Sequence, residues 1–219
     1  MSDKPILFSG EMVRAILDGR KTMTRRVMKP QPIEDKSYVG GFGWNRNKES
    51  CVAVGAPHIG AYCPYGNWEG SRMWVRETWA LWGVPDNTVQ IAYNADDSCV
   101  TYQPSLEDAN KMRDTYIADN ERRPHSAENW RPSIFMPRWA SRLTLEIVDV
   151  RVERVQDISD ADCEREGVNL TNASIAGYVH ERFKKLWDSI NDKRGFGWET
   201  NPWVWVISFR VLRRDMPTG

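Results

Sequence analysis

The stretch "KPILFSGEMVRAILDGRKTMTRRVMKP", residues 4–30, is the most informative part of this chain. Its apolar run at 5–8 is typical of a short strand, and Ser9 is a residue type that caps helix N-termini. Gly19 stands where a left-handed residue ends a helix. The stretch therefore predicts a strand, a short helix and then a second strand over 22–28.

The same stretch concentrates positive charge. Residues 14–29 contain six basic side chains against a single acidic one, Asp18, a local net charge of +5. The whole chain of 219 residues carries 30 basic and 30 acidic residues, and its net charge is zero. A neutral protein has no general field for polyanions, so any surface that binds nucleic acid must be local.

The remaining sequence predicts a mixture of strands and helices without regular alternation. We expect strands at 72–81, 89–103 (a hairpin that turns at the Asp-Asp-Ser of residues 96–98), 141–155 and 203–212, and helices at 105–121, 160–166 and 173–192. Because a parallel sheet requires strands and helices to alternate, this order favours an α+β fold. A small mixed or antiparallel β-barrel with flanking helices fits it best.

Several classes of protein are disfavoured by composition. No apolar run approaches the roughly 18 residues of a membrane span, and the N-terminus lacks the pattern of a signal peptide. The four cysteines form no C-x-x-C pair, which favours a reduced, cytoplasmic protein. Cys51, His58 and Cys63, with Cys99, are an alternative zinc set, but their spacing matches no common finger. We therefore expect no metal ion and no cofactor.

A resemblance to a known family rests on ordered blocks of sequence. Gly19, Lys21 and Arg26 fit the pattern G-x-K-x-x-x-x-R, which resembles the ASCH domain, a PUA-like β-barrel family. The chain is most similar to the longer phage and prophage members. The further matching blocks are "WVRETWA" (74–80), "MPRWASRLTLEIVDVRVERVQDIS" (136–159), "EREGV" (164–168) and "NPWVWVISFRV" (201–211). The resemblance implies one PUA-like domain over 1–219, with insertions at about 31–67 and 83–134.

The resemblance also implies a chemistry. Members of the family are associated with RNA or modified nucleosides, and some small members remove the acetyl group from N4-acetylcytidine with a Lys, a Thr and a Glu. Lys21 and Thr24 match the first two positions, and the Glu position falls best on Glu166, with Glu164 as its competitor. At least one other member is a ribonuclease, so this activity at the same basic cavity is an alternative.

The residues themselves set a condition for this chemistry. Thr24 can act as a nucleophile only if a neutral Lys21 takes its proton, whereas an unperturbed lysine has a pKa of about 10.4. Burial and the like charges of Arg20, Arg25 and Arg26 are expected to lower that pKa. Strand alternation gives Lys21 and Thr24 opposite parity, so Lys21 can join Thr24 only from the turn before the strand.

Binding without catalysis is a second interpretation. The basic side chains at 20–29 would then hold phosphates as part of a nucleic-acid adaptor of phage origin, and a purely structural set of ion pairs is a third interpretation. The candidate binding residues are Gly19, Arg20, Arg25, Arg26, Glu77, Arg138, Trp139 and Arg142. The expected partner is RNA or a modified nucleoside, with DNA as a further candidate and no membrane.

Overall fold

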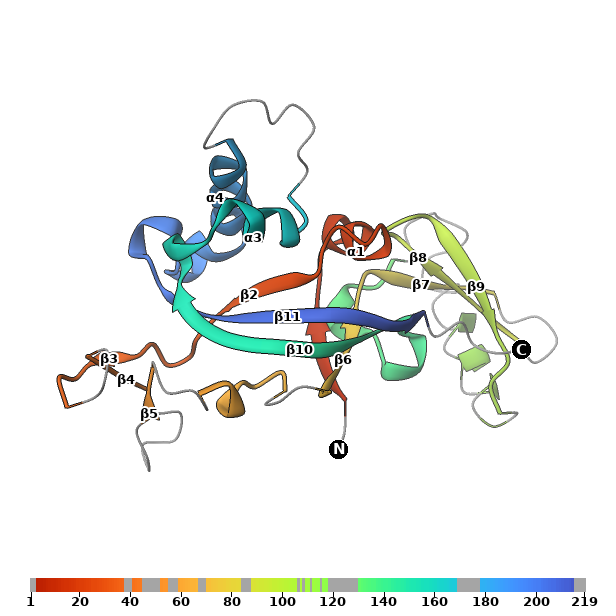
Figure 1. The fold of residues 1–219 in the computed structure, drawn as a ribbon. Helices are drawn as coiled ribbons and strands as arrows, with labels where there is room; N and C mark the ends of the chain where they lie inside the picture. Colours follow the sequence, from red (N-terminus) through yellow and green to blue (C-terminus); the bar gives the residue numbers. More distant parts are fainter. Residues whose placement is uncertain are drawn as a thin grey trace. The chain divides into compact units, whose positions relative to one another are not determined.

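The structure is a computed structural model, drawn in Figure 1. It describes residues 3–37, 41–44, 52–54, 59–66, 70–83, 88–105, 107, 109–110, 112–114, 116–117, 130–168 and 178–214. The chain divides into two compact units. The first contains Met1–Leu17, Arg72–Leu145 and Val211–Gly219, and the second contains Asp18–Ser71 and Glu146–Arg210.

In the first unit, a strand and a helix open the chain as the sequence predicts. β1 (Lys4–Leu7) pairs in parallel with β6 (Arg72–Arg76), with Ile6 opposite Val75. The helix α1 (Gly10–Leu17) follows Ser9, whose hydroxyl accepts a hydrogen bond from the Met12 amide at 3.4 Å. This side-chain cap satisfies one of the amides that a helix N-terminus leaves without an intrahelical partner.

A three-stranded antiparallel sheet also belongs to the first unit. It has the order β7 (Trp79–Gly83), β8 (Val89–Tyr93) and β9 (Ser98–Tyr102). The hairpin turn between β8 and β9 places Asp97 at a φ of 56°, as the predicted turn at Asp-Asp-Ser requires. One face of this sheet carries a core cluster that includes Trp79, Ile91 and Tyr93.

One predicted strand is wrong in its extent. The sequence favours a single strand over 72–81, whereas the structure breaks it at Glu77 and Thr78 into β6 and β7, which belong to different sheets. The break accommodates the Glu77 carboxylate, which is 1% exposed and paired with Arg142. A buried charge of this kind cannot be recognised from period-2 alternation, because it occupies a position that the pattern assigns to an ordinary strand residue.

In the second unit, the strand predicted at 22–28 is present as β2 (Met23–Val27). It pairs antiparallel with β11 (Trp203–Arg214), with Thr24 opposite Ile207 and Arg26 opposite Trp205. β11 also neighbours β10 (Leu143–Arg154). A smaller sheet of β3 (Ile33–Glu34), β4 (Phe42–Trp44) and β5 (Val52–Ala53) belongs to this unit.

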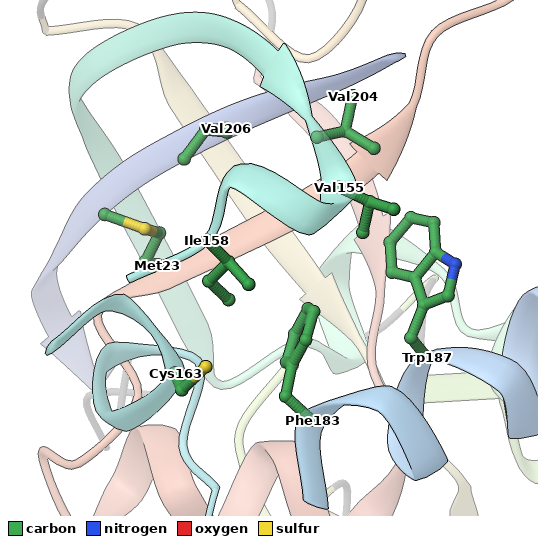
Figure 2. Close-up of a cluster of buried hydrophobic side chains, with 8 residues drawn as sticks. All are labelled: Met23, Val155, Ile158, Cys163, Phe183, Trp187, Val204 and Val206. Carbon is green, nitrogen blue, oxygen red and sulfur yellow. The ribbon is translucent and has the colours of Figure 1, made fainter. Parts of the chain in front are cut away.

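Two helices cover one face of these strands. α3 (Asp160–Arg165) is capped by the Ser159 side chain, and α4 (Tyr178–Asn191) buries Phe183 and Trp187. Figure 2 shows their side chains directed at the strand residues. The eight members of this cluster are Met23, Val155, Ile158, Cys163, Phe183, Trp187, Val204 and Val206. Burial of each large apolar side chain contributes roughly 1.5–3 kcal/mol relative to exposure.

Short 3₁₀ turns connect these elements. They are η1 (Ile59–Tyr62), η2 (Ser133–Phe135), η3 (Arg138–Ala140), η4 (Val155–Asp157), η5 (Asp192–Arg194) and η6 (Trp198–Thr200). In the predicted helix at 105–121, the residues described between 107 and 117 are helical. None of the sheets formed by the described residues closes on itself. The fold is thus α+β, and the single domain with two insertions stays a prediction.

Candidate functional site

Lys21 lies where the chain turns from α1 into β2. Gly19 has a φ of 75°, the left-handed conformation that its position after the helix predicts. Backbone pairing then fixes the following residues. Lys21 forms an isolated antiparallel bridge with Glu166, and the Thr22 amide donates to the Arg165 carbonyl at 2.9 Å. The two segments therefore hold the side chains of Lys21 and Glu166 next to each other.

The Lys21 ammonium is buried against Glu166. The residue is 1% exposed, and Nζ donates to Oε2 of Glu166 at 2.7 Å and to its main-chain oxygen at 2.8 Å. Burial lowers the pKa of Lys21, and this effect exceeds the opposing attraction of Glu166. The positive charges of Arg26 and Arg25 lower it further. The lowered pKa that the sequence predicts from burial and like charge is therefore present, although Arg20 is not among its causes.

Glu166 is placed by the end of α3. It is the C-cap residue of that helix, its amide donates to the Asp162 carbonyl at 2.9 Å, and Gly167 follows with a φ of 84°. Its other carboxylate oxygen, Oε1, accepts from Nη1 of Arg25 at 3.3 Å. The carboxylate thus lies between two cations. Glu164, the competing candidate, is exposed.

Arg25 connects this pair to a wider set of charges. Its Nε donates to Glu153 at 3.0 Å and its Nη2 to Asp162 at 3.0 Å. Arg151 contacts the same two carboxylates, donating to Glu153 at 3.1 Å and to Asp162 at 2.5 Å. The carboxylates raise the pKa of Arg25, so its guanidinium is permanently charged. Arg25 therefore orients Glu166 by charge.

Sequence reasoning did not identify three members of this network: Arg151, Glu153 and Asp162. Their spacing carried a usable signal, since Arg151 and Glu153 lie two residues apart on one face of β10. Asp162 and Glu166 are four residues apart at the end of α3, which places them on the same side of a helix. Neither spacing identifies Arg25 as the partner of these carboxylates, because Arg25 is more than 120 residues away in the chain.

Thr24 and Arg26 follow the alternation of β2. Met23 belongs to the cluster under α4 and Arg25 contacts α3, and strand alternation gives the intervening Thr24 and Arg26 the other parity. Thr24 is buried, at 3% exposed. The Arg26 guanidinium carbon lies 6.0 Å from the ring centroid of Tyr65, and burial lowers the pKa of Arg26. The convergence of Thr24 with Lys21 stays a prediction.

Arg20 remains close to the surface. Its Nη2 donates to Asp18 at 2.8 Å and its Nη1 to the Gly167 carbonyl at 3.3 Å, with both charged side chains about half exposed. An exposed pair of this kind contributes little to stability. It leaves Arg20 accessible for the phosphate contact that the sequence predicts for it.

The remaining predicted binding residues belong to the first unit, where Arg142 is enclosed. Its guanidinium makes bidentate pairs with Glu77, at 2.9 and 2.9 Å, and with Asp96, at 3.0 and 3.0 Å. Its fifth N–H group donates to Ser98 at 2.6 Å. Since a guanidinium has five N–H donors, Arg142 has none left for a ligand. The guanidinium also stacks 4.1 Å from the Tyr93 ring centroid.

The same network assigns a structural role to Glu77. Burial raises the pKa of Glu77 while the bonds from Arg142 oppose that rise. Of the other two predicted residues, Trp139 packs edge-on against Trp79 with ring centroids 5.7 Å apart, and Arg138 is exposed. Among these four residues, Arg138 is the one that presents its charge to solvent.

Half of the alternative zinc set falls outside the described residues. Cys51 and His58 lie outside the described residues, while Cys63 and Cys99 are free thiols. Over the described ranges, no group of three or more histidine, cysteine, aspartate or glutamate side chains is arranged to hold a metal ion. Burial raises the pKa of Cys163 to about 12, so this thiol stays protonated.

Within the same described ranges, no helix has the length and apolar character needed to cross a membrane. Comparison of the chain with protein-family models, with curated proteins and with solved structures finds no match.

The lowered pKa of Lys21 makes stability depend on pH. Folded Lys21 releases its proton at lower pH than unfolded Lys21, so the unfolded chain binds more protons between the lowered pKa and about 10.4. We expect the free energy of unfolding of wild type to rise with pH in that window, relative to Lys21→Met. Urea unfolding of both proteins from pH 7 to pH 10 measures this difference. A difference that stays constant or falls with pH contradicts it.

The Arg142 network predicts a large loss of stability when its cation is removed. In Arg142→Met the buried Glu77 carboxylate loses its partner, which costs about 3–5 kcal/mol of unfolding free energy. The double variant Glu77→Gln/Arg142→Met is expected to lose less, because no buried charge remains. Arg210→Met, which removes an exposed partner of Glu146, is the matched control with an expected loss below about 1 kcal/mol. Equal losses for Arg142→Met and Arg210→Met would show that the network contributes no more than a surface pair.

Proposed function

We propose that this protein binds RNA or a modified nucleoside and hydrolyses the amide bond of an acylated base, with N4-acetylcytidine as the model substrate. The observation that carries the proposal is the buried pair of Lys21 and Glu166, in which Nζ and Oε2 are 2.7 Å apart and the pKa of the lysine is lowered. An amine with a lowered pKa is a candidate general base, and strongly perturbed groups gather at functional sites.

The resemblance to the ASCH family supports the same residues independently. Lys21 and Thr24 occupy the family's positions in the motif, and Glu166 is the carboxylate that contacts Lys21 in space. We also infer that the fold is an elaborated PUA-like β-barrel. Its support is the order of the matching blocks, together with the pairing of the motif strand β2 with the closing strand β11.

The proposed reaction begins with a proton transfer. Neutral Lys21 accepts the proton of the Thr24 hydroxyl, and the Thr24 oxygen attacks the carbonyl carbon of the substrate amide. The C–N bond then breaks, an ester forms on Thr24, and the leaving nitrogen takes the proton from Lys21. Water attacks the ester, which releases the carboxylic acid and returns the proton to Thr24. This is the logic of covalent catalysis with an adjacent base.

The neighbouring charges have separate roles in this scheme. Glu166 accepts hydrogen bonds from Lys21 and so holds the amine in place between proton transfers. Arg25 holds Glu166 from its other oxygen. Arg26 supplies positive charge to polarise the carbonyl oxygen or to hold a phosphate. Charge aimed at an oxygen that becomes negative in the transition state is a large contribution to catalysis.

The test is an assay of cytidine release from N4-acetylcytidine by chromatography. Wild type is expected to release cytidine, and Lys21→Met should lower the turnover number about 100-fold or more, because it removes a general base. Thr24→Val should do the same, whereas Thr24→Ser keeps the hydroxyl and retains activity. Lys185→Met, on the exposed side of α4, is the matched control with unchanged turnover.

Other outcomes separate the competing functions. Shortening of a structured RNA that depends on Lys21, without release of cytidine, supports a ribonuclease and contradicts the amide hydrolysis. Salt-sensitive RNA binding without either product supports an adaptor. Full turnover in Lys21→Met, with unfolding curves confirming a folded protein, would remove this lysine from the chemistry.

A further inference from the structure

A short turn in the first unit presents two apolar side chains to solvent. η2 contains Ile134 and Phe135, which are 58% and 69% exposed. Phe135 is the most exposed large apolar side chain among the described residues. Single exposed apolar residues are common on protein surfaces. The surroundings of Phe135 therefore decide whether it can be a binding residue.

The turn is fixed at both ends. On one side, the Arg131 amide donates to the Trp79 carbonyl at 2.7 Å, and the Trp79 amide donates to the Arg131 carbonyl at 3.3 Å. On the other side, Met136 is 1% exposed, and its sulfur accepts from the Glu77 amide at 3.4 Å. Phe135 is therefore held on a braced backbone, which reduces the entropy that binding would cost.

Arginine side chains surround the same turn. Nη1 of Arg76 donates to the Ile134 carbonyl at 3.2 Å, which places its charge beside the exposed pair. The guanidinium carbons of Arg76 and Arg138 lie 4.7 and 6.0 Å from the ring centroid of Trp74. Two like charges thus share one buried indole.

The balance of charge at this place is positive. The sequence over 130–142 contains three arginines and no acidic residue, and of these Arg142 is already paired with Glu77 and Asp96. Asp3 pairs with Arg138 at 3.4 Å, whereas Arg76 donates to the neutral carbonyl oxygen of Ile134. An exposed aromatic ring beside excess positive charge is complementary to a base with its phosphates.

We propose that η2, with Arg76 and Arg138, is a contact surface for single-stranded RNA. Phe135 stacks on an unpaired base, and the two arginines contact the phosphates on either side of it. The inference rests on the proposed function in taking RNA as the partner. It favours a single strand, because a duplex hides the faces of its bases and offers an aromatic ring no stacking partner.

The test is fluorescence anisotropy with a labelled single-stranded uridine 12-mer and with a labelled RNA duplex of equal length. Wild type should bind the single strand more tightly than the duplex. Phe135→Ala should weaken single-strand binding about tenfold, within the range found for aromatic side chains that stack on bases. Phe135→Tyr keeps the ring and should restore the affinity. Ile33→Ala, which truncates an apolar side chain that is 64% exposed in the second unit, is the matched control with unchanged affinity.

Salt dependence tests the phosphate contacts separately. Arg138→Gln should reduce the slope of log affinity against log salt by about 0.7, the value for one phosphate of a single strand. Arg72→Gln removes one charge from an exposed residue on β6 and should leave the slope unchanged.

Three results would overturn the inference. They are absence of single-strand binding by wild type, equal affinity of Phe135→Ala and wild type, and binding to vesicles of anionic phospholipid in place of RNA. Free N4-acetylcytidine makes no use of this surface, so Phe135→Ala should hydrolyse it at the wild-type rate. Hydrolysis of N4-acetylcytidine without single-strand binding would contradict the RNA surface alone. Single-strand binding that depends on Phe135, without hydrolysis, would contradict the proposed hydrolase alone.

Discussion

The buried ammonium of Lys21 is the constraint on which the second unit depends. An isolated charge is costly to bury, and the Glu166 carboxylate offsets that cost with a hydrogen bond of 2.7 Å. To provide it, the turn at Gly19 must deliver Lys21 to the end of α3, and α3 must end at Glu166. Arg25 then shares the same carboxylate, so the Glu166 side chain joins the turn, β2 and the end of α3.

The two buried charge networks of this protein differ in what they can do chemically. In the first unit, all five N–H groups of Arg142 are bonded, and an arginine does not lose its proton at any ordinary pH. That network holds the backbone break at Glu77 in place. In the second unit, the central cation is a lysine whose pKa is lowered by burial. A lysine can release its proton, which is why the proposed chemistry rests on Lys21.

Much of the secondary structure could be predicted because its signals are local. The Ser9 cap, the left-handed Gly19 and the hairpin turn at Asp97 each depend on neighbouring residues. The break of the strand at Glu77 could not be predicted, because its cause is an arginine 65 residues away. The closure of a barrel likewise depends on pairings between distant strands, and alternation along one strand does not specify them.

The sequence pointed to some residues of the candidate site and missed others, because it carries local signals but not contacts between distant segments. The motif identified Lys21 and its basic neighbours, and the resemblance to the ASCH family implied Glu166, with Glu164 as its competitor. The Arg25 network depends on charges from three elements, which no local pattern joins. Arg142 shows the opposite error, since a basic residue in a promising block is enclosed by carboxylates and is not available to phosphates.

The central claim is that burial outweighs Glu166 in setting the pKa of Lys21. NMR titration of protein with ¹⁵N-labelled lysine side chains measures this directly, with the Lys21 signal assigned by its loss in Lys21→Met. We predict a pKa for Lys21 clearly below about 10.4, the value of an unperturbed lysine. A Lys21 pKa equal to or above that value would show that the ion pair dominates, and it would leave the protein without its proposed base.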